Sequence, residues 1–332
     1  MNIRHKFWVL ILATCMSFWV VACSSQVAQR ANPTECQTVQ HKLGETCVPV
    51  HPQRVIAIDS GVLEAALALD VKPIASAEQR AVGSLWKFVG EQQEIFVSLG
   101  REGEPNLEKM LQLDPDLIMG IAISHKNYEL FNKIAPTVVF ENVHDQWKQT
   151  LQRVAEVLGE RSKSEQVLAQ YQARIEDFQS AMGKRLEQTE VSIARFYAAY
   201  PPEFRTRVTF PGSVLEDVGL LRPLAQRQIE SKKFFEKVSL ERLDLLDGDV
   251  IFVALDPGAE DSFREFQTSP LWQTLKAVKN DRVYVVDSGY WIFGNILSAN
   301  LILDDLFEYL IQEKTSNRTE PSSINKASYA NT

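Results

Sequence analysis

The chain has 332 residues, of which 45% are hydrophobic and 23% are charged. This length exceeds what one hydrophobic core usually holds, so two domains are expected. The formal net charge is −8, from 43 acidic and 35 basic residues. Because no basic stretch is interleaved with aromatic residues, the sequence lacks the pattern of a nucleic-acid-binding protein, and no nucleic-acid partner is expected.

The first 22 residues are typical of an export signal. Arg4 to Lys6 form a basic start, and an apolar run follows from Phe7 to Ala22. The run has about 16 residues, which is short for a membrane span and fits a secretory signal. It ends at Cys23 in a pattern that resembles the lipobox of bacterial lipoproteins, in which this cysteine carries the lipid. We therefore expect a protein anchored by its lipid in the periplasm or at the outer cell surface; the alternative is an uncleaved anchor helix with an incidental cysteine.

The chain contains four cysteines. Cys15 lies inside the signal, and Cys23 is the expected site of lipidation. Cys36 and Cys47 remain as a pair in an oxidising compartment, which favours a disulfide between them. His41 lies between the two, but the Cys–His spacings do not fit a zinc site. We predict the disulfide and no directly bound metal ion.

Two segments resemble tails. Residues 23–40 are rich in Ser, Gln, Asn and Pro and are predicted to be a flexible tether. Residues 314–332 contain almost no apolar side chains and are predicted to be disordered. Between them we expect an N-terminal α/β lobe over 41–160, a connecting helix over 161–188 and a second α/β lobe over 189–313.

Apolar strands and helices alternate in the first lobe. The sequence predicts strands over 54–59, 71–75, 116–121 and 137–140, and helices over 64–69, 107–113 and 128–134. Strands that are apolar throughout and are separated by helices indicate a parallel sheet covered on both faces.

The next segment predicts one long helix over 162–188. Its apolar residues are spaced by three or four positions along one stripe: Leu168, Tyr171, Ile175, Phe178, Met182 and Leu186. A helix of about 25 residues is about 37 Å long, because each residue adds 1.5 Å. Such a helix can run along two small domains.

The α/β alternation then starts again. Strands are predicted over 191–196, 249–255 and 282–287. Helices are predicted over 214–218 and 240–246, from a cap at Ser269-Pro270, and over 299–311. The predicted fold class is therefore α/β, with two lobes joined by a single long helix.

Short motifs recur in order along residues 41–311. They are found at 41–46, 52–55, 99–100, 105–108, 113–118, 134–138, 219–220, 222–223 and 238–241, and at Trp291 and Gly294. Together they resemble the helix-hinged binding proteins that serve ABC importers of ferric siderophores, cobalamin and haem. Arg222-Pro223 and the segment before Arg54 look most like the ferric-citrate and ferric-hydroxamate branch.

The resemblance implies two Rossmann-like lobes with a ligand cleft between them, and a monomeric binding protein rather than an enzyme. It implies no cofactor; the ligand is an iron chelate, and the partners are an ABC permease and its ATPase subunit. One glutamate on each lobe would meet the permease, and the matching residues are Glu108 and Glu241. The alternative for both is a solvated glutamate in the first turn of a helix, stabilised by the helix dipole.

Candidate ligand-binding residues follow from the chemistry of such chelates. An anionic, oxygen-rich ligand is best held by arginine and by aromatic side chains, at the carboxyl ends of the strands. Trp291 corresponds to a cleft aromatic of the family, and Arg222 has a structural role as its alternative. The full set at or after predicted strand ends is Arg80, Trp86, Arg101, His125, Arg195, Tyr197, Arg205, Arg207, Arg222 and Trp291.

Rival functions remain open at this point. The sequence contains no Gly-x-Ser-x-Gly elbow and no Gly-x-Gly-x-x-Gly after the first strand. It also lacks a Walker loop, so the ATPase would be another chain. Cobalamin or haem on the same fold is the first alternative, with Tyr197 or His125 as an axial ligand. A lipid-anchored metal-ion carrier or an enzyme is the second, and it would need clustered histidines and carboxylates.

Overall fold

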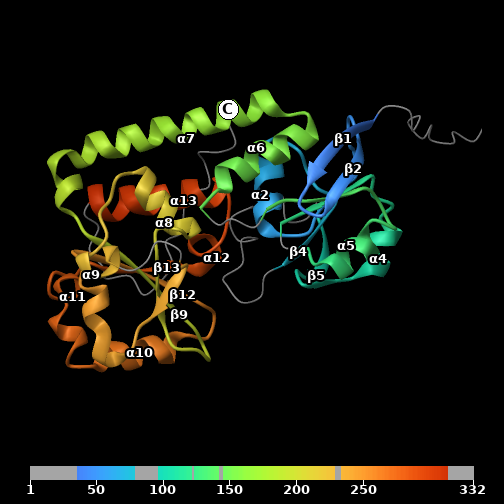
Figure 1. Ribbon diagram of the computed structural model, residues 1–332. Helices are drawn as coiled ribbons and strands as arrows, with labels where there is room; N and C mark the ends of the chain where they lie inside the picture. The colour runs from blue at the N-terminus through green and yellow to red at the C-terminus, as the bar shows by residue number, and fades with distance from the viewer. Residues whose placement is uncertain (1–35, 79–95, 122, 142–144, 229–232, 313–332) are drawn as a thin grey trace, which may run out of the picture. The chain divides into compact units, whose positions relative to one another are not determined.

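The computed structural model describes residues 36–78, 96–121, 123–141, 145–228 and 233–312 (Figure 1). The described residues from Gln37 onward belong to one compact unit. Within it, two α/β lobes with largely parallel sheets are connected by the helix α7, Arg161–Met182. This is the predicted fold class.

The chain enters the first lobe through a hairpin of β1, Cys36–His41, and β2, Gly44–Pro49. The hairpin is fixed to β8, since Lys42 N donates to the carbonyl of Val139 over 2.9 Å and Thr46 Oγ1 to that of Thr137 over 3.1 Å. Cys36 and Cys47 are both disulfide-bonded. Residues 36–40 are therefore strand rather than tether, which corrects that part of the prediction.

The first lobe contains a six-stranded sheet in the order β6-β5-β4-β3-β7-β8, parallel except at the β5–β6 pair. The predicted strands appear as β3 and β7, both wholly buried, and as β8, whereas the second one starts later, at Ala75. The strands are β3 Val55–Ala57, β4 Ala75–Glu78, β5 Val97–Arg101, β6 Glu104–Pro105, β7 Leu117–Gly120 and β8 Thr137–Val139. The helices are α2 Ser60–Ala68, α4 Leu107–Gln112, α5 His125–Phe131 and α6 Trp147–Leu158.

The connecting helix α7 confirms the predicted apolar stripe. Tyr171, Ile175, Phe178 and Met182 are all buried along one side of it. The last six residues of the predicted helix form a 3-10 helix, Gly183–Gln188, in which no residue is buried. No helix in the described part of the chain is long and apolar enough to span a membrane.

The second lobe contains a five-stranded sheet in the order β11-β10-β9-β12-β13. The pairs β9–β12 and β12–β13 are parallel, whereas β10 and β11 are antiparallel additions at one edge. The strands are β9 Val191–Phe196, β10 Glu203–Arg205, β11 Phe235–Lys237, β12 Val250–Leu255 and β13 Val283–Asp287. The α-helices are α8 Phe210–Asp217, α9 Leu224–Arg227, α10 Glu260–Thr268, α11 Lys276–Lys279, α12 Ser288–Trp291 and α13 Ile296–Leu306. The other helical turns are η3 Leu240–Leu246, η4 Trp272–Thr274 and η5 Phe307–Ile311.

One predicted helix is wrong. The sequence predicts a helix that starts at Ser269, but the helix of this region, α10, ends at Thr268. Ser269 has extended backbone angles and is followed by a proline, which disfavours helical continuation. The next turn is the short 3-10 helix η4, and its Trp272 packs edge-on against Phe263 at 5.7 Å.

The two lobes share one hydrophobic core. A single buried apolar cluster contains Val55 and Leu63 of the first lobe together with Phe252 and Ile302 of the second. Trp147 of α6 lies 5.2 Å from the ring of Tyr171 on α7 and 6.1 Å from that of Phe210 on α8. Figure 1 shows α7 running past α6 and α13, so this helix covers the shared core.

Glu64 and Asp305 are buried carboxyl groups whose hydrogen-bond donors, among the described residues, are uncharged. Glu64 of α2 accepts from Asn295 N and from Ser298 N and Oγ, and burial raises its pKa to about 7 although these donors oppose the shift. Asp305 of α13 accepts from the Tyr290 hydroxyl and from Trp291 Nε1. Burial raises the pKa of Asp305 to about 7 as well.

A raised carboxyl pKa makes the folded state less stable at high pH. The stability that such a group contributes is complete below its unfolded pKa, about 4.3 for Glu, and is lost as pH rises through the folded value near 7. We predict that Glu64→Gln gains stability relative to the parent between pH 5 and pH 8, by on the order of 2 kcal/mol. Urea unfolding at both pH values measures this, and an identical difference at the two pH values would show that Glu64 does not titrate in this range.

Candidate ligand-binding site

The second lobe carries a cluster of arginine and aromatic side chains at the carboxyl end of β9. Antiparallel pairing places Glu203 of β10 opposite Arg195 of β9. Because side chains alternate along a strand, Arg205 lies on the same face as Glu203, while Phe204 points into the core on the other face. The sheet therefore gathers two arginines and one glutamate that are distant in sequence.

Arg195 is held by a buried ion pair. Its Nε lies 3.1 and 3.2 Å from the two carboxylate oxygens of Asp256, and its Nη2 lies 2.9 Å from one of them. The side chains of Arg195 and Asp256 are only 5% and 6% exposed, so the pair is largely shielded from water. The guanidinium carbon also lies 4.4 Å from the ring centre of Tyr197 and 5.6 Å from that of Phe293.

Arg205 continues the cluster. Its Nη2 lies 3.3 Å from Oε1 of Glu203, and its guanidinium carbon lies 5.8 Å from the ring centres of Phe235 and Phe293. The hydroxyl of Tyr197 donates to the same Glu203 oxygen over 2.5 Å. Burial lowers the pKa of Arg205, and burial together with the hydrogen bond to Glu203 raises the pKa of Tyr197. Tyr197 is therefore a neutral donor at physiological pH.

Arg222 lies beneath these residues. Its Nη2 donates to the backbone carbonyl of Arg205. Its Nε and Nη1, and the Nε of Arg205, are buried and have no hydrogen-bond partner among the described side chains. Burial lowers the pKa of Arg222 to about 10. The cluster thus holds Arg195 against Asp256 and Arg205 against Glu203, with Arg222 in the field of Glu216, and it has unused donors. Unused guanidinium donors suit an anionic ligand rich in oxygen.

The other predicted ligand-binding residues lie apart from the cluster or outside the described residues. Arg207 is exposed and pairs with Glu216 at 3.4 Å. Arg101 on β5 and His125, the first residue of α5, are exposed residues of the first lobe. Arg80 and Trp86 fall outside the described residues. The predicted lipidation at Cys23 and the predicted disorder of residues 314–332 also concern residues that the structure does not describe.

The structure corrects the placement of Trp291. Its side chain is fully buried, its ring stacks on Phe252 at 4.7 Å, and its Nε1 donates to Asp305 over 2.7 Å. Phe293, two residues later, has its ring at the arginine cluster instead, 5.6 Å from the guanidinium carbon of Arg195. Trp291 is the last residue of the single-turn helix α12, and Phe293 lies just beyond it. The ring of Trp291 therefore lies in the core, whereas the ring of Phe293 lies at the arginine cluster.

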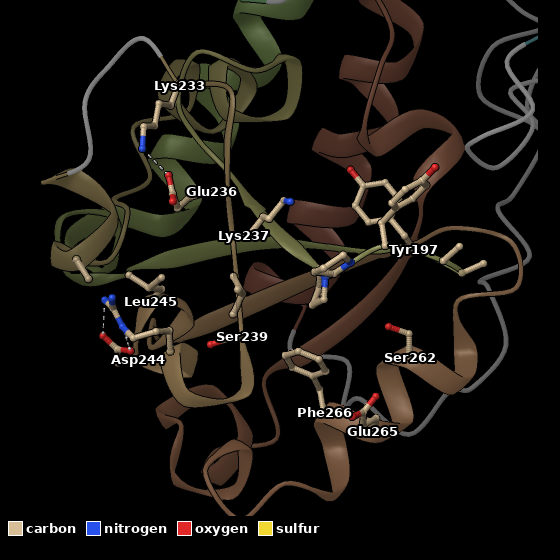
Figure 2. A pocket seen from close by; sticks show the side chains of 18 of the residues that line it. Tyr197, Lys233, Glu236, Lys237, Ser239, Asp244, Leu245, Ser262, Glu265 and Phe266 are labelled. Atoms are coloured by element: carbon tan, nitrogen blue, oxygen red, sulfur yellow. Dashed lines mark hydrogen bonds and ion pairs between the residues drawn. The ribbon is translucent and has the colours of Figure 1, made fainter.

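A cavity of about 1210 Å³ lies beside the cluster. Its wall includes Tyr197, Lys237 and Phe266. Figure 2 shows the amino group of Lys237 extending toward Tyr197, while Ser262 and Phe266 lie on the other side. Tyr197 therefore belongs to both the arginine cluster and the cavity. Its ring lies against Arg195, and it is one of the residues that line the cavity.

The two glutamates expected to meet a permease are both exposed and lie in the first turns of their helices. Glu108 is in α4 and accepts a hydrogen bond from Gln112 over 3.3 Å. Glu241 is in η3, and hydrogen bonds from Ser239 and from its own backbone lower its pKa. Within the described ranges, no group of three or more His, Cys, Asp or Glu residues is placed to hold a metal ion.

Comparison with known proteins identifies the family of this chain. Residues 55–290 match the family described as periplasmic binding protein. The chain belongs to this family. It is 30% identical to the probable siderophore-binding lipoprotein YfiY of Bacillus subtilis (strain 168), over 92% of this chain and 96% of that protein. It is 29% identical to the Fe(3+)-citrate-binding protein YfmC of the same organism, over 90% and 94%.

The fold is also similar to that of Staphylococcus aureus SirA in its complex with staphyloferrin B. The TM-score is 0.71 at 27% identity, and the match covers 82% of this chain and 98% of SirA. Together with the family match, this places the chain among the binding proteins whose two lobes are linked by a helix.

The buried pair of Arg195 and Asp256 generates a stability prediction. Asp256→Asn removes the carboxylate that forms the bidentate, buried pair with Arg195, so we expect a loss of about 3 kcal/mol in the free energy of unfolding. The control is Asp261→Asn, which breaks the exposed pair with Arg264 and costs less than about 1 kcal/mol. Chemical denaturation measures both; equal losses in the two variants would mean that the Arg195 pair is no more shielded than a surface pair.

Proposed function

We propose that this chain captures a ferric siderophore, with citrate- or hydroxamate-type chelates as the expected class, and delivers it to an ABC importer. The observation that carries the proposal is the arginine cluster of the second lobe. Arg195, Arg205 and Arg222 lie together there, and two of them, Arg205 and Arg222, have buried N–H groups without a hydrogen-bond partner among the described residues. Ferric chelates of this class present carboxylate or hydroxamate oxygens that can accept those hydrogen bonds.

The aromatic rings support the same ligand class. Phe293 lies against both Arg195 and Arg205, and Phe235 lies against Arg205. These rings restrict the guanidinium groups before the ligand arrives, and a preorganised site binds more tightly because less entropy is lost. The ligand would then complete the hydrogen bonds that the protein leaves unmade.

The relatives favour iron chelates over the cobalamin or haem alternative. YfiY is named as siderophore-binding and YfmC as Fe(3+)-citrate-binding, and SirA was solved with staphyloferrin B. Tyr197, the tyrosine considered as a haem ligand, donates a hydrogen bond from its hydroxyl to Glu203 and is a neutral phenol. An anionic chelate is therefore the better fit to this site.

The proposal extends to location and partners. The signal over residues 1–22 and the lipid on Cys23 would hold the protein outside the cytoplasm, and the name of YfiY as a lipoprotein supports this. Glu108 and Glu241, one on each lobe, would meet cationic groups of the permease. Exposed charges of this kind increase the encounter rate and fix the orientation more than they raise the affinity.

We predict that Arg205→Gln weakens binding of ferric staphyloferrin B or ferric citrate by tenfold or more, on the order of 2 kcal/mol, because a buried charge contact to the ligand is lost. Quenching of tryptophan fluorescence on titration of the soluble domain, from residue 24 onward, measures the affinity. Arg264→Gln, which removes an exposed arginine paired with Asp261, is the matched control and should bind like the parent. A response of the parent to haemin or cobalamin alone would reject the ferric chelate.

We predict that the double variant Glu108→Ala, Glu241→Ala binds the chelate normally but supports no uptake. The reason is that both carboxylates are exposed on helix starts and lie outside the arginine cluster. Uptake of radiolabelled iron by cells that depend on this chain measures the effect. The control is Glu129→Ala, Glu260→Ala, which removes two other exposed glutamates. A loss of chelate affinity in the first double variant would instead place these carboxylates in the ligand site.

A further inference from the structure

Glu64 makes a direct connection between the two lobes. It lies on α2 of the first lobe and is fully buried, yet the described groups that donate hydrogen bonds to it belong to the start of α13 in the second lobe. One carboxylate oxygen accepts from Asn295 N over 2.8 Å and from Ser298 N over 2.9 Å. The other accepts from Ser298 Oγ over 2.7 Å. All three donors are uncharged.

The geometry is that of a helix cap supplied from outside the helix. Asn295 is the N-cap of α13, and its side chain accepts from Ile296 N over 2.8 Å. In a capping box, the residue three positions after the cap would reach back to the backbone N–H of the cap. Here that position is Ser298, and Glu64 of the other lobe bonds to the N–H of Asn295 in its place. The positive end of the helix dipole favours the carboxylate at this point.

The capped turn leads directly to the arginine cluster. Phe293 lies two residues before Asn295, and its ring is 5.6 Å from the guanidinium carbon of Arg195 and 5.8 Å from that of Arg205. Gly294 between them is tightly packed: a Cβ there would lie 3.1 Å from Oε1 of Glu64 and would collide with Ser298. The segment 293–295 therefore has little freedom as long as Glu64 holds its end.

The helix α2, which carries Glu64, is also held in place within the first lobe. Asp59, which follows β3, caps α2 by accepting from Val62 N over 2.9 Å. It also accepts from Ile121 N, the residue after β7, over 2.5 Å. Asn295 is fixed further, because its side-chain amide donates to the carbonyl of Trp147 on α6 over 3.3 Å. A displacement of α2 relative to α13 would thus be transmitted to Phe293.

We propose that Glu64 is a positioning residue for the ligand site: by capping α13 from the first lobe, it holds Phe293 against Arg195 and Arg205. The affinity of the second-lobe cluster then depends on a carboxylate of the first lobe that does not touch the ligand. This inference rests on the proposed function, because it assumes that the arginine cluster binds the iron chelate.

The test compares affinity with stability. Glu64→Ala should weaken binding of ferric staphyloferrin B by about tenfold, because Phe293 is then no longer held against the arginines before the ligand arrives. Glu64→Gln keeps the size of the side chain and one acceptor oxygen, so it should restore most of the affinity; it also carries the test if the alanine variant does not fold. Ile302→Val, a buried change on the same helix away from the cap, is the control.

The outcomes separate the inference from the function. Fluorescence titration well below the unfolding temperature gives the affinity, and urea unfolding gives the stability of each variant. Weakened binding in Glu64→Ala, partial rescue in Glu64→Gln and unchanged binding in Ile302→Val would support a positioning role. Parental affinity in Glu64→Ala, or an equal loss in Ile302→Val, would overturn it and leave the proposed function intact. A parent that binds none of the ferric chelates would overturn the proposed function, and the inference with it.

Discussion

The hydrophobic core beneath α7 is continuous between the two sheets. Side chains of α2, α6, α7, α8 and α13 meet in it, and the ring contacts of Trp147 with Tyr171 and Phe210 cross from one lobe through the connecting helix to the other. Close-packed interiors transmit displacement rather than absorb it. The positions of the loops that follow the strands, and therefore of the polar groups on them, depend on this packing.

Burying a charged or polar side chain costs free energy, and the hydrogen-bond partners of Arg195 and Glu64 offset this cost. Arg195 forms a bidentate ion pair with Asp256. Glu64 lies at the N-terminus of α13, where the first backbone N–H groups need acceptors. Arg205 and Arg222 are different, since part of their donor capacity is unused. Buried unmade hydrogen bonds reduce stability, and a ligand that makes them gains the corresponding free energy on binding. The site is thus less stable than a fully paired cluster and more receptive to anions.

Much of the fold could be predicted from the sequence where local periodicity determines the structure. The strand over 191–196 and the long apolar stripe of α7 depend on their own residues, so both were predicted closely. β1 was missed because its sequence is polar, and its stability comes from pairing with β2 and from bonds to β8. The predicted helix at Ser269 failed because a capping pattern alone does not determine a helix.

The candidate site was predictable to the extent that it follows strand ends. Arg195 and Tyr197 could be selected from the end of an apolar strand, and the structure places them together with Arg205. That Phe293 and not Trp291 lies at the arginine cluster could not be predicted from the sequence. Trp291 is held in the core by its hydrogen bond to Asp305, a contact that only the tertiary structure brings about. Glu64 could not be recognised either, since its partners are more than 230 residues away in the sequence.

The position of the iron atom tests the central claim most directly. Crystals of the soluble domain with ferric staphyloferrin B, measured at the iron absorption edge, locate the metal by its anomalous scattering. We predict a single peak beside Arg195, Arg205 and Phe293 of the second lobe. A peak in the cavity lined by Lys237 and Phe266, with none beside the arginines, would contradict the account.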